Sequence, residues 1–265
     1  MAIHDSLGDR MKEYEGRNQY YLQKRTPVCI RVDMRAGHTF TRGFARPFDE
    51  VFGNAMVRTM EYCAKNMGNC VFAYCQSDEI TFILVDYAKL ETDAWFDYRT
   101  DKLCSISASM ATMAFNSFFE MEMNVFKASH TIFDTNEWAY PEAGALYGAY
   151  MLSASKGAMF DARCFNIPKE EACNLVYWRQ LDATRNSIQM VGQANFSHNE
   201  LQGCSCNMIQ DMLHEQRGIN WNDYPTRWKR GVAWTRHGGI DYDMPILKGE
   251  SREYVDTVIY PEVEE

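Results

Sequence analysis

Two aspartates, Asp33 and Asp78, lie where the sequence predicts that strands end or turn. Asp33 closes the segment 27–33, in which apolar and polar residues alternate, and Asp78 lies in a short connection between two apolar runs. If these strands are neighbours in one sheet, both carboxylates emerge at one edge. Mg²⁺ takes few protein carboxylates and fills its other positions with phosphate oxygens and water. The pair therefore suits a magnesium site that serves a triphosphate, where two ions about 3.5–4 Å apart assist a displacement. The alternative is two aspartates that cap turns.

Charged residues around this pair could bind phosphate. The segment 24–46 carries six basic side chains and a single acidic one, Asp33, although the whole chain has a net charge of −9. A local basic segment on an acidic protein can hold a phosphate-bearing ligand, and the alternative is a solvated surface. Glu79 points to the opposite side from Asp78 in an extended chain, and Lys102 begins a predicted helix from which it could reach phosphates. The six basic residues are Lys24, Arg25, Arg31, Arg35, Arg42 and Arg46.

Other chemistries find little support. The chain has no Gly-x-x-x-x-Gly-Lys-Ser/Thr loop and no nucleophile elbow, and neither His38 nor His130 has a partner at metal-ligand spacing. The nine cysteines include no Cys-x-x-Cys pair, which predicts reduced thiols in a cytoplasmic protein. No apolar run is long enough to cross a bilayer, and we expect neither a signal peptide nor a membrane contact.

The elements that must position the aspartates can be read from hydrophobic periodicity. We predict a strand at 27–33, a helix from 48 to about 67, a hairpin of strands 70–76 and 80–85, a helix through 103–118 and a strand at 161–167. This order is the split β-α-β-β-α-β pattern of ferredoxin-like and polymerase-palm folds. Helices are expected at 170–196 and 201–215, and strands or extended segments at 228–235 and 254–260.

Five blocks in order resemble the tRNA-histidine guanylyltransferase family. They are Ile-Arg-Val-Asp-Met-Arg-Ala-Gly-His-Thr-Phe at 30–40 with Phe-Ala-Arg-Pro at 44–47, Tyr-Cys-Gln-Ser-Asp-Glu at 74–79, Phe-Asp-Ala-Arg at 160–163, Tyr-Trp-Arg-Gln-Leu-Asp at 177–182, and a late pair, Leu-Gln-Gly at 201–203 and Trp-Lys-Arg-Gly at 228–231. The resemblance implies an α+β fold forming a single body. A palm-like catalytic core (1–168) would carry a helical C-terminal extension and tail (169–265).

The resemblance also implies roles for individual residues. Asp33 and Asp78 would bind metal together with the carbonyl of Met34, which replaces a glycine of the family, and Glu79 would join both aspartates in catalysis. The residues implied to bind nucleotide are Asp33, Met34, Arg35, Ala36, Gly37, His38, Arg46, Ser77, Asp78 and Lys102. Those implied to bind RNA are Arg179, Asn186, Lys229 and Arg230.

The implied activity is addition of nucleotides to the 5′ end of a tRNA, with two Mg²⁺ ions, ATP and GTP. A 5′-monophosphate would first be adenylated, and the 3′-hydroxyl of an incoming nucleotide would then attack the activated phosphate. Where the family has His-Ile-Asn-Asn, this chain has Thr-Arg-Asn-Ser at 184–187 and keeps only Asn186. This departure favours template-dependent repair of tRNA 5′ ends, and we expect a homo-oligomer, by family tendency a tetramer.

Three alternatives stay open at this point. The first is addition of a single G to tRNA-His. The second is a palm-fold nucleotide cyclase, whose hairpin signature the Gln-Ser-Asp-Glu turn does not match. The third is a catalytically silent RNA-binding protein, which retention of both aspartates disfavours.

Overall fold

The computed structural model describes residues 6–132 and 137–261. Its centre is an antiparallel sheet in the order β4-β1-β3-β2-β5-β6. Four strands, β1 (Val28–Met34), β2 (Cys70–Gln76), β3 (Glu79–Leu84) and β4 (Phe160–Asn166), form the core of this sheet. Together with α3 (Glu50–Asn66) and α4 (Thr100–His130) they make the expected β-α-β-β-α-β unit, so the predicted fold class is confirmed.

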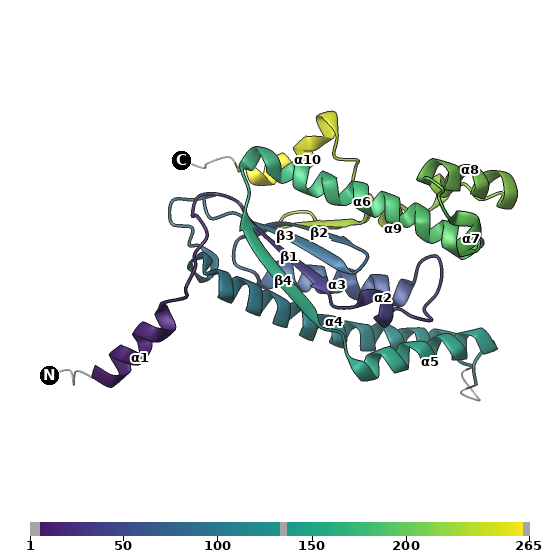
Figure 1. Ribbon diagram of the computed structural model, residues 1–265, viewed down its shortest axis with the longest axis horizontal. Helices are drawn as coiled ribbons and strands as arrows, with labels where there is room; N and C mark the ends of the chain where they lie inside the picture. The colour runs from purple at the N-terminus through teal and green to yellow at the C-terminus, as the bar shows by residue number, and fades with distance from the viewer. Residues whose placement is uncertain (1–5, 133–136, 262–265) are drawn as a thin grey trace.

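One face of the sheet carries the larger core. Helices α3 and α4 cover this face, and α5 (Pro141–Lys156) lies along α4 (Figure 1). The alternation in β1 explains the packing, because Val28, Ile30 and Val32 are fully buried among these helices. Successive residues of a strand point to opposite faces, so Arg31 and Asp33 are directed to the other side of the sheet.

The second face is covered by α6 (Lys169–Asn195), which crosses the sheet in Figure 1, and by α10 (Glu253–Ile259). The prediction of an extended segment at 254–260 was therefore wrong. Val255 and Ile259 are spaced four residues apart and both are buried, which is a helical pattern. The remaining short elements of this half are α7 (His198–Leu201), α8 (Cys206–Arg217), η2 (Trp221–Asp223), α9 (Thr226–Arg230) and η3 (Gly249–Arg252).

The C-terminal half also extends the sheet. Strands β5 (Val232–Thr235) and β6 (Gly239–Asp241) continue it beyond β2, so only the second part of the predicted segment 228–235 is a strand. Gly231 precedes β5 at φ 85°, and a Cβ there would lie 2.6 Å from the carbonyl oxygen of Cys75. Glycine is thus required where α9 meets the sheet.

At the other end of the chain, α1 (Ser6–Gly16) projects away from the body and buries none of its residues (Figure 1). A turn of 3₁₀ helix, η1 (Trp95–Tyr98), precedes α4, and α2 (Gly37–Phe40) follows β1. Within residues 6–132 and 137–261, no helix is long and apolar enough to cross a membrane.

Candidate active site

Four acidic residues lie at the edge of the sheet where β1 ends and where β3 and β4 begin. Asp33 of β1 is the register partner of Glu79 on one side and of Asp161 on the other. Asp78 lies in the turn between β2 and β3, and its carbonyl accepts a hydrogen bond from the backbone of Met34 (3.0 Å). Because β1 and β3 are neighbours in the sheet, the structure brings Asp33 and Asp78 to one edge, as predicted for neighbouring strands.

The environment of Asp33 opposes its ionisation. Burial raises the pKa of this carboxyl from 3.8 to about 6, helped by the negative charges of Asp78, Glu79 and Asp161 and opposed by Arg163. Like charges held close together disfavour the charged form of each. A bound cation would relieve this repulsion, so the site is electrostatically suited to a cation.

Asp78 is held against the start of α2. Ala36 takes the left-handed conformation (φ 56°), and this turns the chain so that Gly37 faces Asp78. A Cβ at Gly37 would lie 2.0 Å from Oδ2 of Asp78, so only glycine allows this approach. The carboxylates of Asp33 and Asp78 offer hard oxygen donors of the kind that Mg²⁺ prefers, and the resemblance adds the carbonyl of Met34 to them. Across the part of the chain that the structure describes, no group of three or more His, Cys, Asp and Glu side chains is placed to hold a metal.

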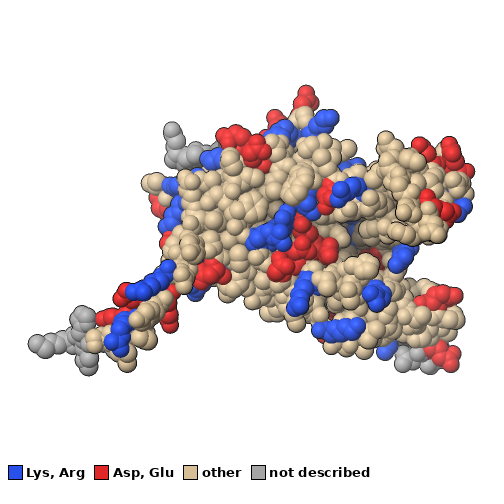
Figure 2. Space-filling model, viewed as in Figure 1, with Lys and Arg blue, Asp and Glu red and all other residues tan. Residues whose placement is uncertain are grey.

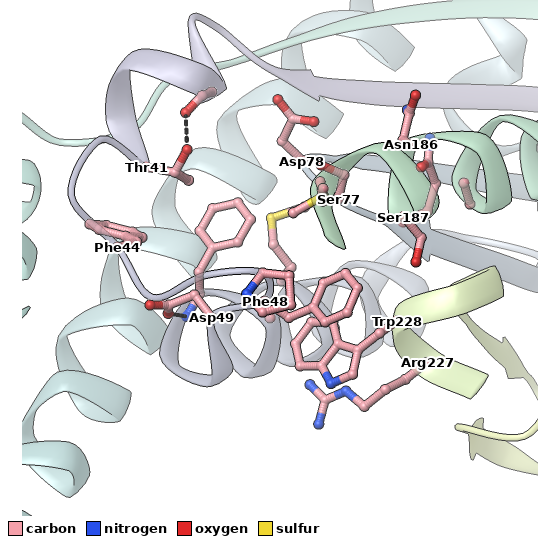
Figure 3. Close-up of a pocket in the computed structure, with 18 of the residues that line it drawn as sticks. Thr41, Phe44, Phe48, Asp49, Ser77, Asp78, Asn186, Ser187, Arg227 and Trp228 are labelled. Atoms are coloured by element: carbon pink, nitrogen blue, oxygen red, sulfur yellow. Dashed lines mark hydrogen bonds between the residues drawn. The ribbon is translucent and has the colours of Figure 1, made fainter. Parts of the chain in front are cut away.

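A cavity of about 480 Å³ opens beside Asp78. Its walls come from α2, the loop 41–49, α3, the β2–β3 turn, α6 and the α9–β5 junction, and Figure 3 shows Asp78, Ser77 and Asn186 on one side of it and Phe48 and Trp228 on another. This volume is typical of small-molecule sites. Of the predicted nucleotide and RNA residues, those that line the cavity are Gly37, His38, Arg46, Ser77, Asp78 and Asn186.

One buried carboxylate fixes the loop that walls the cavity. Asp49 caps α3 by accepting from the backbone of Phe52 (2.9 Å), and it also accepts from the backbone of Ala45 (2.9 Å) and the hydroxyl of Tyr150 (2.7 Å). Burial, followed by the charge of Asp49, raises the pKa of Tyr150 well above its ordinary value, so this hydroxyl stays a donor. These three bonds hold the loop in one conformation.

Two aromatic rings complete the opposite wall. Phe48 stacks on Trp228, with ring centroids 5.1 Å apart and an angle of 5° between the planes. Gly53 of α3 lies under the indole, because a Cβ there would come within 2.4 Å of it. We did not predict Phe48, Asp49 or Trp228 as site residues. The only signal available was that Trp228 belongs to one of the motif blocks.

Glu79, predicted to be catalytic, lies beneath α6 and away from the cavity. It is buried and accepts from Nε of Arg179 (2.7 Å), while Nε of Arg31 lies 3.6 Å from its other oxygen. Arg179 also donates to Asp182 (2.9 Å). Arg179, predicted to bind RNA, is therefore occupied by two carboxylates inside the protein.

The other predicted residues lie further out. Lys102 is in the first turn of α4 over the ring of Phe96 (5.7 Å), and it is not among the residues that line the cavity. Arg35 is exposed, with its backbone bonded to Met159 (2.8 Å). Lys229 donates to the carbonyl of Asn222, and Arg230 lies at the end of α9 next to the cavity.

The basic segment 24–46 does not act as one surface. Lys24 pairs with Asp97, and the guanidinium of Arg25 donates to the carbonyls of Asp86 and Lys89, all away from the cavity. Of the six basic residues of this segment, Arg42 and Arg46 are the two that line the cavity.

Known proteins resemble the chain in both sequence and overall structure. Residues 8–168 match the profile of a family described as tRNA(His) guanylyltransferase. The chain belongs to this family. It is 36% identical to a bacterial tRNA(His) guanylyltransferase-like protein whose structure was solved in complex with ATP, over 96% of this chain and 100% of that one, with a TM-score of 0.80.

Two further similar proteins belong to the same family. A structure of a bacterial tRNA(His) guanylyltransferase-like protein in complex with GTP is 34% identical over 97% of this chain and 100% of that one, with a TM-score of 0.75. The tRNA(His) guanylyltransferase of Saccharomyces cerevisiae is 28% identical over 231 residues, which are 80% of this chain and 84% of the relative. Membership of the guanylyltransferase family confirms the resemblance of the motif blocks and makes the chain a nucleotidyltransferase.

Proposed function

We propose that this chain adds nucleotides to the 5′ end of tRNA, from ATP, GTP and other nucleoside triphosphates, in a template-dependent repair reaction. One observation carries the proposal, because Asp78 lines the 480 Å³ cavity and also neighbours Asp33 at the edge of the sheet. A nucleotide in the cavity would therefore present its phosphates to two carboxylates. The complexes of similar bacterial proteins with ATP and GTP support a nucleotide as the occupant.

The residues of the chain have distinct tasks in this proposal. Phe48, stacked on Trp228, gives the cavity an aromatic wall for a base, and Arg42 and Arg46 bring positive charge to its rim. Asp33 and Asp78, with the Met34 carbonyl, would hold Mg²⁺, which would neutralise phosphate charge and favour loss of pyrophosphate. The protein then contributes positioning and charge stabilisation, which are the main needs of phosphoryl-type transfer.

The reaction has two steps. A 5′-monophosphate oxygen of the RNA attacks the α-phosphate of ATP, which forms an adenylated 5′ end and releases pyrophosphate. The 3′-hydroxyl of an incoming nucleotide then attacks the RNA phosphate, which forms the new phosphodiester and releases AMP. Both steps need one electrophilic phosphate and one oxygen nucleophile beside the same carboxylates.

The segment 184–187 favours repair over addition of a single G. Asn186, the residue retained from the family's run, lines the cavity. Arg185 is bonded to Asp182 (2.5 Å), and the hydroxyl of Ser187 accepts from the indole of Trp221 (3.0 Å). Arg185 and Ser187 thus make these contacts within the protein, although Ser187 also lines the cavity, and we expect the opposing RNA strand to select the nucleotide.

The decisive experiment compares two transcripts with an activated 5′ end. One is a tRNA that lacks its first 5′ nucleotide, and the other is an intact tRNA-His. We expect faster extension of the truncated tRNA, with an incorporated base that follows the opposing base when that base is changed. Preference for intact tRNA-His, with G added whatever lies opposite, would restore the single-G function, whereas a cyclic product or no product would overturn both.

The expected homo-tetramer is a separate part of the proposal. The mass of the protein in solution, measured by light scattering, tests it.

A further inference from the structure

A large aromatic side chain lies exposed beside the carboxylate edge. Trp178 of α6 keeps 52% of its surface in solvent, and two guanidinium groups lie against its ring, that of Arg179 at 4.6 Å and that of Arg31 at 5.7 Å from the ring centre. Both arginines are themselves fixed by the buried Glu79. The indole is therefore supported from within the protein and is open on the outside.

This ring lies close to the reacting edge but outside the cavity. Arg31 precedes Asp33 by two residues, about 7 Å of strand, on the same face of β1, and its guanidinium carries the contact with Trp178. Neither Trp178 nor Arg31 lines the cavity, whereas Asn186, two turns further along α6, does. Trp178 thus lies outside the cavity that Asp78 lines, about two turns of α6 away from Asn186 and against the side chain of Arg31.

The surroundings of Trp178 carry exposed positive charge. Arg163 of the edge strand β4 is the register partner of Arg31 and is 52% exposed, and its pairing with Asp161 is long (3.5 Å). Arg185 follows Trp178 by seven residues on α6, which places it on the same side of the helix; it is 61% exposed, with one guanidinium nitrogen paired with Asp182. Figure 2 shows basic side chains gathered directly beside acidic ones over the face on which β4 lies in Figure 1.

We propose that Trp178 is a stacking platform for the 5′-terminal base of the RNA, with Arg163 and Arg185 binding the phosphates that follow it. The inference rests on the proposed function, because a 5′-end transfer needs a place for the RNA terminus outside the nucleotide cavity but near the same carboxylates. Exposed aromatic rings beside arginines hold single bases by stacking, while guanidinium groups contact phosphates without regard to sequence. Such a platform holds any terminal base, as a repair enzyme requires.

The test uses an acceptor-stem RNA duplex with 5′-phosphorylated 2-aminopurine as its terminal base, whose fluorescence falls on stacking. We expect wild-type protein to quench the fluorescence. Trp178→Leu, which keeps an apolar contact for both arginines, should abolish the quenching and weaken RNA binding roughly tenfold to a hundredfold. Trp178→Phe should keep most of both, and Leu181→Ala, which removes another half-exposed apolar side chain of α6, should change neither.

Steady-state kinetics separate a binding role from a structural one. Trp178→Leu should raise KM for RNA and leave KM for the nucleoside triphosphate unchanged, while its melting temperature stays near that of Trp178→Phe. Unchanged quenching and an unchanged KM for RNA in Trp178→Leu would overturn the platform and leave the proposed function intact. A wild-type protein that does not quench the fluorescence would also overturn the platform. Quenching that depends on Trp178, in a protein that adds no nucleotide, would support the platform and refute the proposed reaction.

Discussion

Replacement of Asp33 by asparagine should stabilise the metal-free protein at neutral pH while abolishing nucleotide addition. The pKa of Asp33 rises from 3.8 to about 6 in the folded state, chiefly through burial and then through three neighbouring carboxylates. A folded-state pKa above the unfolded value means that the folded protein holds its proton more tightly, so stability falls as pH rises from about 4 to 6. Above pH 6 the loss of stability caused by the ionised Asp33 is fully present.

The magnitude follows from the shift. Two pKa units correspond to about 3 kcal/mol at most, and because Asp33 is only half-buried, solvent and salt screening reduce the expected gain to about 1 kcal/mol. For a chain of this length that is an increase in melting temperature of about 2–4 °C.

Thermal unfolding in EDTA between pH 5 and 8 checks this prediction. The difference between Asp33→Asn and wild type should be largest at pH 7–8 and shrink towards pH 5, whereas Asp211→Asn, an exposed carboxylate on α8, should show no such trend. Added Mg²⁺ should stabilise wild type more than the variant. A variant that is less stable than wild type at pH 7.5, or that retains normal activity, would refute the reasoning.

Three further changes test the site and its supports. Arg46→Ala should raise KM for the nucleoside triphosphate several-fold, with the rate restored at high substrate concentration, because Arg46 lines the cavity. An equal effect of Lys102→Ala would show that the lysine reaches the nucleotide from outside the cavity. Asp49→Ala removes the acceptor of three hydrogen bonds and should lower the free energy of unfolding by about 2–4 kcal/mol in urea titrations, and a loss below about 1 kcal/mol would contradict its structural role. Gly231→Ala should lower the free energy of unfolding by about 2 kcal/mol or more, because the residue has φ 85° and the new Cβ would lie 2.6 Å from a carbonyl. Gly218→Ala, left-handed but in open space, should lower it by about 1 kcal/mol. Equal losses would mean that the contact with Cys75 is unimportant.

Local pattern predicted the part of the fold that holds the carboxylates. The short turn at 77–79 fixes the pairing of β2 with β3 and so the place of Asp78, and the alternation in β1 fixes the face of Asp33. That β1 is the neighbour of β3 was an assumption, which the sheet order confirms. Helix α5 was not predicted, since its small and apolar residues give no amphipathic stripe, although Pro141 at its first turn is a typical start signal. In α10, β-branched and aromatic residues suggested a strand, but burial of Val255 and Ile259 decided for a helix.

The cavity could not be predicted in this way. Its aromatic wall joins Phe48 and Trp228, which are distant in the sequence and meet only because β5 pairs with β2. The buried position of Arg179 likewise depends on how α6 crosses the sheet, and composition alone cannot separate an arginine that binds RNA from one that neutralises a carboxylate.

The pairing of charges at the sheet edge separates the carboxylates by task. Glu79 is neutralised by Arg179 and Arg31, and Asp161 has Arg163 beside it. Asp33 and Asp78 form no ion pair in the described parts of the chain, residues 6–132 and 137–261, although they lie in the same cluster. Burial of Asp33, followed by the charges of its neighbours, raises the pKa of its carboxyl and costs stability when it ionises. Because arginines of the described residues pair with Glu79 and Asp161 but not with Asp33 and Asp78, the latter two carboxylates stay available for the Mg²⁺ that the proposed function requires.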